Sequence, residues 1–135
     1  MAIQLSATVR NARLDAIETA IGASAVLKMR SGAVPASCAA ADSGTVLATV
    51  NLPSDWMASA SGGSKEIAGT WEDLSADATG TAAHFRLYAS DGSTCHLQGS
   101  VTATGGGGDM TVDNTSFASG QKFTVTGFTL TDGNS

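Results

Sequence analysis

The sequence predicts a mainly β fold, an antiparallel β-sandwich or jelly-roll-like domain with one N-terminal α-helix. Apolar residues recur at helical spacing only near the start of the chain, and after Gly22 they alternate with polar residues to the end. Turn-rich stretches divide this second part into seven or eight short segments, as in sandwiches and jelly rolls. The length of 135 residues suits a single domain, 1–135, with the helix at 6–21 and the sandwich at 24–131.

The predicted helix has suitable residues at both ends and a wide apolar arc. Ser6 is a good N-cap, Gly22 can end the helix, and no Pro or Gly interrupts it. At 100° per residue, Asn11, Asp15 and Glu18 form a narrow polar face opposite the arc. The arc is too wide to rest on a single surface, and it consists of Leu5, Val9, Ala12, Leu14, Ala16, Ile17, Ala20 and Ile21.

Arg10 and Arg13 project within this arc, and two interpretations of them stay open. In the first, their aliphatic stems lie on the sheet and their guanidinium groups reach water. In the second, the arc contacts both its own sheet and a neighbouring subunit, and the arginines pair with carboxylates across that contact. The second interpretation makes Arg10, Arg13, Ile17 and Ile21 candidate interface residues.

The strands are predicted from side-chain alternation. Ala25, Leu27 and Met29 point to one face of the first strand, and the basic residues between and after them point to the other. Further strands are expected in TVLATVNL, KEIAGTW and DMTVD, with polar or glycine-rich loops between them. In the last strand, KFTVTGFTLT, the apolar phase changes across Gly127, which predicts a β-bulge or bend there.

The clearest hairpin is AAHFRLYAS-DGS-TCHLQGSVT, and its side chains predict the register. Pairing Leu87 with Leu97 puts Phe85 opposite Gly99, so that the apolar residues of both strands share one face. This register needs an odd-length loop centred on Gly92 and sets Tyr88 opposite His96. The outer face, a second candidate interface, then carries His84, Arg86, Tyr88, His96 and Gln98.

Composition and charge exclude several classes of function. Only 14% of residues are charged and the net charge is −5, with no basic cluster, so nucleic-acid binding is not expected. No apolar stretch is long enough to span a bilayer, and no secretory leader or lipidation motif is present, so we expect synthesis in the cytoplasm and no membrane contact.

The sequence predicts no enzyme, no cofactor and no metal site. Serine, histidine and acidic residues occur, but none lies in a nucleophile elbow, and the acidic residues cluster in loops. His84 and His96 are expected about 13 Å apart along the hairpin, too far to bind one ion. Trp56 and Trp71 are expected as core anchors or interface residues, with a sugar-stacking platform as the alternative.

Cys38 and Cys95 are the two cysteines of the chain, and they match neither a redox nor a zinc motif. One interpretation is a pair of buried or half-buried thiols. The other is a disulfide, within the chain or between subunits, that forms after release into an oxidising medium.

Three segments together resemble a group of small virion structural proteins of tailed bacteriophages. They are TVRNARLDAIETAIGASAVLKMRSGAVP, SADATGTAAHFRLYASDG and VDNTSFASGQKFTVTGFTLTDG, and the chain departs from the group's pattern at Cys38 and Cys95. The resemblance implies a β domain that works by assembly. The scarcity of charge and the thin core agree, because such a chain can complete its burial against copies of itself or a capsid surface.

The resemblance leads to the expectation of a capsid decoration or cement protein located in the virion. Its partners would be itself, with a trimer as the first expectation, and the major capsid protein or another virion protein. A neck, collar, tail or fibre-base component is the alternative within the virion. From another class, a carbohydrate-binding β-sandwich used in adsorption stays open, with Trp56, Trp71 and Tyr88 as stacking residues.

Overall fold

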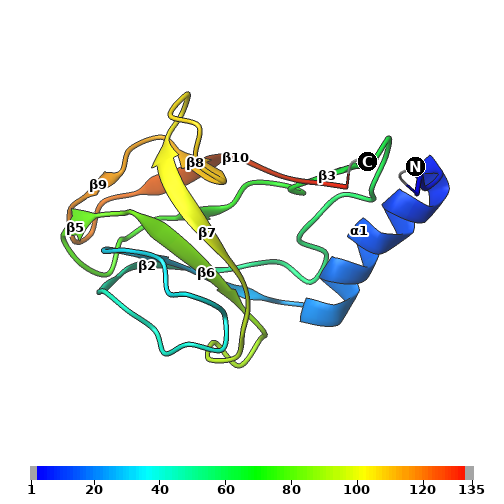
Figure 1. Cartoon of the computed structure of the whole chain (residues 1–135). Coiled ribbons are helices and arrows are strands. Elements are labelled where there is room, and N and C mark those ends of the chain that lie inside the picture. The colour runs from blue at the N-terminus through cyan, green and yellow to red at the C-terminus, as the bar shows by residue number, and fades with distance from the viewer. Residues whose placement is uncertain (1–2, 133–135) are drawn as a thin grey trace.

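A computed structural model describes residues 3–132 and confirms the predicted class, mainly β with one N-terminal helix (Figure 1). The helix begins one residue after Ser6, whose hydroxyl accepts a hydrogen bond from the Val9 N–H, and it ends at Gly22. The elements are α1 (Ala7–Ile21), β1 (Val26–Arg30), β2 (Val46–Asn51), β3 (Ser64–Glu66), β4 (Glu72–Asp73), β5 (Gly80–Thr81), β6 (His84–Tyr88), β7 (Cys95–Ala103), β8 (Met110–Val112), β9 (Ser116–Phe117) and β10 (Phe123–Thr131).

The main sheet is mixed. Its strand order is β2-β1-β6-β7-β8-β10-β3, β4 also pairs with β10, and β5 and β9 form a separate two-stranded sheet. Every named pair is antiparallel except β7 with β8, which run parallel with Val101 beside Met110. The TGGGG loop makes this possible by returning the chain alongside β7. A side chain at Gly108 would come within 2.9 Å of Thr102, so glycine permits the close return.

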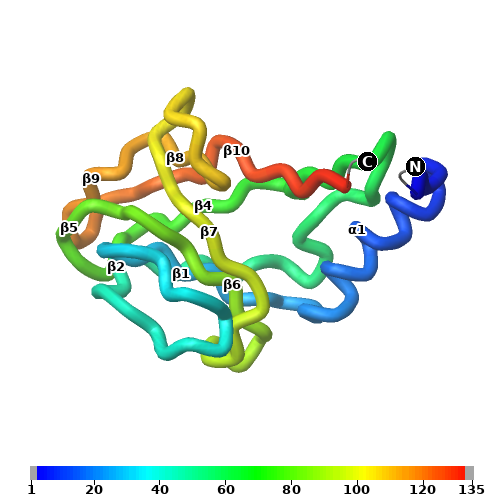
Figure 2. The backbone as a smooth tube through the Cα atoms, in the orientation of Figure 1, coloured from blue at the N-terminus to red at the C-terminus, as the bar shows by residue number. Residues whose placement is uncertain are grey.

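The sheet curls so that its two halves enclose the core (Figure 2). Two strands separate β6 from β10 in the sheet, yet the ring of Phe85 on β6 meets that of Phe128 on β10 at 5.5 Å. Trp71 packs against Phe128 at 5.8 Å and against Trp56 at 5.9 Å. Both tryptophans are fully buried, which confirms their interpretation as core anchors. It also removes them as sugar-stacking residues.

The predicted register is confirmed along most of the β6–β7 hairpin and is wrong near its loop. Leu87 pairs with Leu97 and Phe85 with Gly99, but Tyr88 pairs with Cys95 rather than His96. A bulge between Leu87 and Tyr88 shifts the register, so the loop does not have the expected odd length. The predicted irregularity in β10 is confirmed, because its register with β8 shifts just before Gly127.

The orientation of α1 differs from the prediction. The expected outward polar face points toward the body of the protein, where Asn11, Asp15 and Glu18 accept hydrogen bonds from the backbone N–H groups of Gly63, Ala60 and Met57 at 2.9, 2.9 and 3.1 Å. Only two helix residues, Leu14 and Ile21, are fully buried. The alanines of the predicted apolar arc, Ala12, Ala16 and Ala20, are exposed.

Candidate functional site

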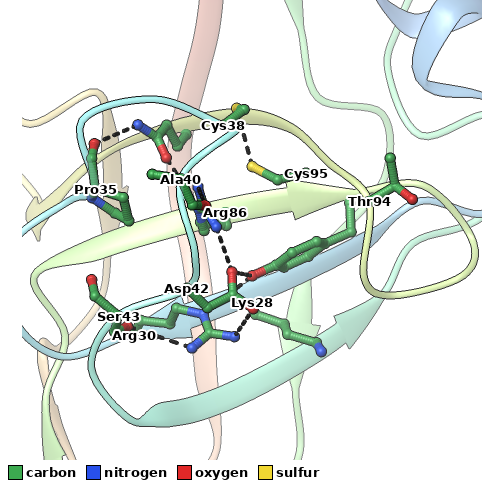
Figure 3. A network of polar contacts seen from close by, with 12 residues as sticks. Lys28, Arg30, Pro35, Cys38, Ala40, Asp42, Ser43, Arg86, Thr94 and Cys95 are labelled. Atoms are coloured by element: carbon green, nitrogen blue, oxygen red, sulfur yellow. Dashed lines mark hydrogen bonds and ion pairs between the residues drawn. The ribbon is translucent and has the colours of Figure 1, made fainter.

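The loop between β1 and β2 covers the hairpin face that the sequence predicts to be outward (Figure 3). We call residues 33–44 of this loop the strap. In chain order it runs from the end of β1, over β6 and β7, to the start of β2. Its contacts with the sheet are polar, and the central one is the carboxylate of Asp42. The strap therefore buries the face of the hairpin that the sequence predicts to be exposed.

Arg86 projects from β6 into the strap and is held by four acceptor groups. Its guanidinium donates to the Asp42 carboxylate, to the carbonyl oxygens of Ser37 at 2.8 Å and Ala40 at 3.1 Å, and to the side-chain oxygen of Gln98 at 3.0 Å. Its side chain is 2% exposed. An arginine this deeply buried requires a compensating anion, and Asp42 supplies it.

Arg30 and Tyr88 complete the cluster around the same carboxylate. Arg30 pairs with Asp42 at 3.0 Å and donates to the Tyr88 hydroxyl at 3.2 Å, and that hydroxyl donates to Asp42 at 2.7 Å. Lys28 lies 5.0 Å from the centre of the Tyr88 ring, a cation–π contact. One carboxylate thus accepts from two cations and a phenol.

The cluster shifts the acid–base equilibria of its members. Burial disfavours the charged form of Asp42, but hydrogen bonds from Tyr88 and Arg86 and the charges of both arginines outweigh it, so its pKa lies below the ordinary 3.8. The pKa of Tyr88 is raised, first by burial and then by its bond to Asp42. Both shifts keep the aspartate ionised and the phenol protonated, which is the arrangement that the arginines need.

The structure therefore corrects the expectation that the hairpin's outer face is free for a partner. His84, Arg86 and Tyr88 are fully buried, and Gln98 is half-buried with its amide donating to the Pro35 carbonyl at 2.7 Å. Of the five predicted residues only His96 is exposed. Tyr88 also loses its proposed role in stacking on a sugar.

His84 lies under the start of the strap. Its Nδ1 is 2.8 Å from the carbonyl oxygen of Gly32, and its Nε2 is buried with no partner among residues 3–132. The tautomer that protonates Nδ1 satisfies the close contact, because the Gly32 carbonyl can only accept.

The two cysteines meet at the edge of this cluster. Cys38 on the strap and Cys95 at the start of β7 have their sulfur atoms 3.0 Å apart (Figure 3). Both are free thiols and half-buried. Burial and the contact with Cys38 raise the pKa of the Cys95 thiol to about 11, against an opposing effect of the Arg86 charge.

At the helix, the predicted interface residues are divided between interior and surface. Ile21 is buried and Ile17 is half-buried against the core. Arg10 donates to the backbone carbonyl of Asp132 at 3.2 Å, and Arg13 pairs with the Asp132 carboxylate at 3.1 Å. Both arginines thus contact the chain's own C-terminal strand region, with Arg10 half-buried and the Arg13 side chain still 60% exposed to water.

A second polar cluster, which the sequence analysis missed, anchors α1. Lys65 on β3 is 2% exposed and pairs with Asp15 at 2.7 Å and Glu18 at 2.9 Å. Burial lowers the pKa of this ammonium, but its bonds to the two carboxylates outweigh the burial and raise the pKa above 10.5. The one signal in the sequence is the spacing of Asp15 and Glu18, which puts both carboxylates on one helix face.

The outward face of α1 has little in the described structure to cover it. Ala12, Ala16 and Ala20 are exposed, and so is Val9, at 44%. Ile3, just before the helix, is 83% exposed. Asp15 and Glu18 lie on the opposite face, where both bond to Lys65, so neither carboxylate is part of this outward apolar face.

A cavity of about 620 Å³ opens between β7 and β10, because β8 between them has only three residues. Its lining includes Phe85, Leu97, Phe128 and Leu130. Within residues 3–132 no group of three or more His, Cys, Asp or Glu side chains is placed to hold a metal ion. No helix in the same range is long and apolar enough to cross a bilayer.

Comparisons of this chain with protein-family models, with curated proteins and with solved structures found no match.

Proposed function

We propose that this chain is a small structural protein of a tailed-phage virion, most simply a capsid decoration protein that works by contacts between subunits. The observation that carries the proposal is the orientation of α1. The helix turns its acidic face inward onto Lys65 and leaves its alanine face in water. The resemblance of three chain segments to phage virion proteins supports the same role.

The occupant that we assign to the alanine face is a second copy of this chain. Each copy carries a net charge of −5, so most surfaces of two copies would repel each other. The outward face of α1 avoids this repulsion, because Asp15 and Glu18 already pair with Lys65. Small side chains also let two backbones approach closely, which suits a packed interface.

The role in the virion divides into two steps, self-association through α1 and binding to the head. The major capsid protein is the proposed partner in the second step. A neck, collar, tail or fibre-base position is the alternative, and it would use the same self-association.

Location is tested by quantitative mass spectrometry of purified particles after heads and tails are separated. Hundreds of copies in the head fraction, in a simple ratio to the capsid protein, support decoration. A few dozen copies or fewer in the tail or neck fraction would replace decoration by the alternative. Absence from particles would overturn the virion role.

Self-association is tested by charge placed on the helix. In the variant Ala12→Glu with Ala16→Glu, we expect the oligomer to dissociate, measured by light scattering after size exclusion, with little change in melting temperature. The matched control is Ala118→Glu with Ser119→Glu, which adds the same two charges at exposed residues far from α1 in sequence, after β9. If the helix variant stays as oligomeric as the control, α1 is not the interface.

A further inference from the structure

The strap is held to the sheet by non-covalent contacts that depend heavily on one charge. Asp42 supplies the only charged group between residues 31 and 44, and it pairs with both buried arginines. Protonation of this carboxylate would weaken its bonds to Arg30, Arg86 and Tyr88 together. A covalent connection elsewhere on the strap would keep it closed independently of that charge.

The cysteines are placed to make this connection. Their sulfur atoms are 3.0 Å apart, closer than two unbonded sulfur atoms usually come, although 57 positions separate the residues in the chain. Cys38 lies near the middle of the strap, and Cys95 is the first residue of β7, a nine-residue strand anchored on β6. A bond needs an approach of only about 1 Å, since a disulfide is about 2.05 Å long.

We propose that Cys38 and Cys95 form an intrachain disulfide that fastens the strap over Arg86 when the protein meets a low-molecular-weight disulfide such as oxidised glutathione. In this exchange, one cysteine thiolate attacks the oxidant and releases one glutathione thiol. The second cysteine then attacks the mixed disulfide, forming the Cys38–Cys95 bond and releasing the second glutathione thiol. The two protons from the cysteines end on the two glutathione molecules, and the oxidant takes up the two electrons.

The environment of the pair sets the conditions for the reaction. Because the pKa of Cys95 is raised to about 11, little of its thiolate is present at neutral pH. The bond should therefore form slowly at pH 7 and faster as the pH rises. Its biological timing rests on the proposed virion role, since a virion leaves a reducing cytoplasm for an oxidising medium. The bond itself does not depend on that role.

The test uses the full reduced chain incubated with oxidised glutathione at pH 8. We expect loss of both alkylatable thiols, an intact mass lower by two hydrogen atoms, and a monomeric covalent species on a non-reducing gel. Peptide mapping should find Cys38 joined to Cys95. Persistence of both free thiols, a stable glutathione adduct, or a bond between two chains would each overturn the proposal.

The double variant Cys38→Ser with Ala39→Cys is a matched control that tests whether the position of the strap thiol matters. It keeps two cysteines in the chain but moves one of them to the neighbouring exposed strap residue. We expect its intrachain bond to form at least about tenfold more slowly than in the native chain, because effective concentration depends on geometry. Equal rates would mean that the strap is mobile and that the observed contact does not direct the bond.

Whether the disulfide holds the strap against the sheet is measured separately, by the exchange of backbone amide hydrogens. The Ala40 N–H donates at 3.0 Å to the Ser37 carbonyl, which also accepts from Arg86 at 2.8 Å, so the exchange of this N–H reports loosening of the strap from the sheet. We expect oxidation to slow this exchange by about tenfold or more, and a reductant to reverse the effect. In the variant Cys38→Ser with Cys95→Ser, neither reagent should change it. Equal exchange in the oxidised and reduced native chain would refute the fastening role even if the bond forms.

Discussion

Replacing Asp42 by asparagine should destabilise the folded protein by about 2 kcal/mol. The substitution keeps the shape of the side chain but removes the one negative charge that faces Arg30, Arg86 and Tyr88. Arg30 and Arg86 are 7% and 2% exposed, so water cannot replace the lost charge without opening the strap. The free energy of unfolding should therefore fall.

The size of the expected loss follows from how far Asp42 and the two arginines are exposed to water. Removing one member of a fully buried ion pair costs about 3–5 kcal/mol. Asp42 itself is 41% exposed, so solvent already screens part of its attraction to the arginines. Arg86 also keeps its bonds to the carbonyl oxygens of Ser37 and Ala40. Both effects lower the expected cost to about 2 kcal/mol, or roughly 6–10 °C in melting temperature for a chain of this size.

The assay is urea denaturation of the reduced protein at pH 7, compared with Glu66→Gln. Glu66 is exposed on β3, and its substitution removes the same charge. We expect the free energy of unfolding of this variant to stay within about 0.5 kcal/mol of that of the native protein. Equal stability of the two variants would show that Asp42 does not hold the arginines. The reasoning about the strap would then be wrong.

Acid should remove the difference between the native protein and Asp42→Asn. Because the pKa of Asp42 is lower in the folded state than 3.8, its contribution is fully present above that pH and is lost as the pH falls through the folded value. The two unfolding curves should therefore converge below pH 3.8 and stay a constant distance apart from pH 5 to 8. A gap that persists in acid would assign the effect to packing rather than to charge.

Two further substitutions test the anchoring of α1 by Lys65 and the close contact at Gly44, the last residue of the strap. Lys65→Met should cost about 2–3 kcal/mol in urea denaturation, because it leaves two carboxylates facing an apolar side chain, whereas Lys122→Met, with its lysine 56% exposed, should cost under about 1 kcal/mol. Gly44→Ala should destabilise by more than about 2 kcal/mol, since a methyl group there would lie 1.8 Å from the Ser31 carbonyl oxygen and φ is +70°. Gly105→Ala is its control, with φ at +85° but open space around it, and should cost about 1 kcal/mol. If the two variants of either pair lost the same free energy of unfolding, the contact that distinguishes them would not be the cause of the loss.

Features set by neighbouring residues could be predicted from the sequence. The helix ends follow from Ser6 and Gly22, which act within one turn. The pairing of Leu87 with Leu97 follows because a shift by one residue would turn every apolar side chain of a strand to the wrong face. The register shift before Gly127 follows from the change of phase in β10. Each depends on contacts or alternation within a short stretch of chain.

The orientation of α1 could not be predicted in this way, because its partners come from a distant loop. Burying an alanine gains little, since it has one methyl group to remove from water. On the other face, Asp15 and Glu18 find two backbone N–H groups and the ammonium of Lys65. Charged hydrogen bonds to these partners outweigh the alanines, and nothing within the helix sequence shows that they are available.

The prediction that the hairpin's outer face is exposed failed for a related reason. Basic residues that alternate along a strand usually face water, and Arg86 and Arg30 fit that pattern. The deciding residue, Asp42, lies in a loop of small residues, where a lone aspartate indicates only a turn. A pair of arginines on the neighbouring strands β1 and β6, with one acidic residue in the loop that follows β1, is the signal that would have predicted the strap.

The burial of three basic side chains in ion pairs predicts how the proposed self-association should respond to salt. Of the seven Lys and Arg residues, Lys65, Arg30 and Arg86 are buried in ion pairs with Asp15, Glu18 and Asp42, so these charges cancel and the net charge of −5 remains on the rest of the chain. Contact between copies through the alanine face of α1 uses few charges, and salt screens only the repulsion between the acidic bodies. Raising NaCl from about 0.05 to 0.5 M should therefore leave the oligomer intact or tighten it. Dissociation by salt, seen in sedimentation velocity, would mean that ion pairs hold the subunits together and that α1 is the wrong surface.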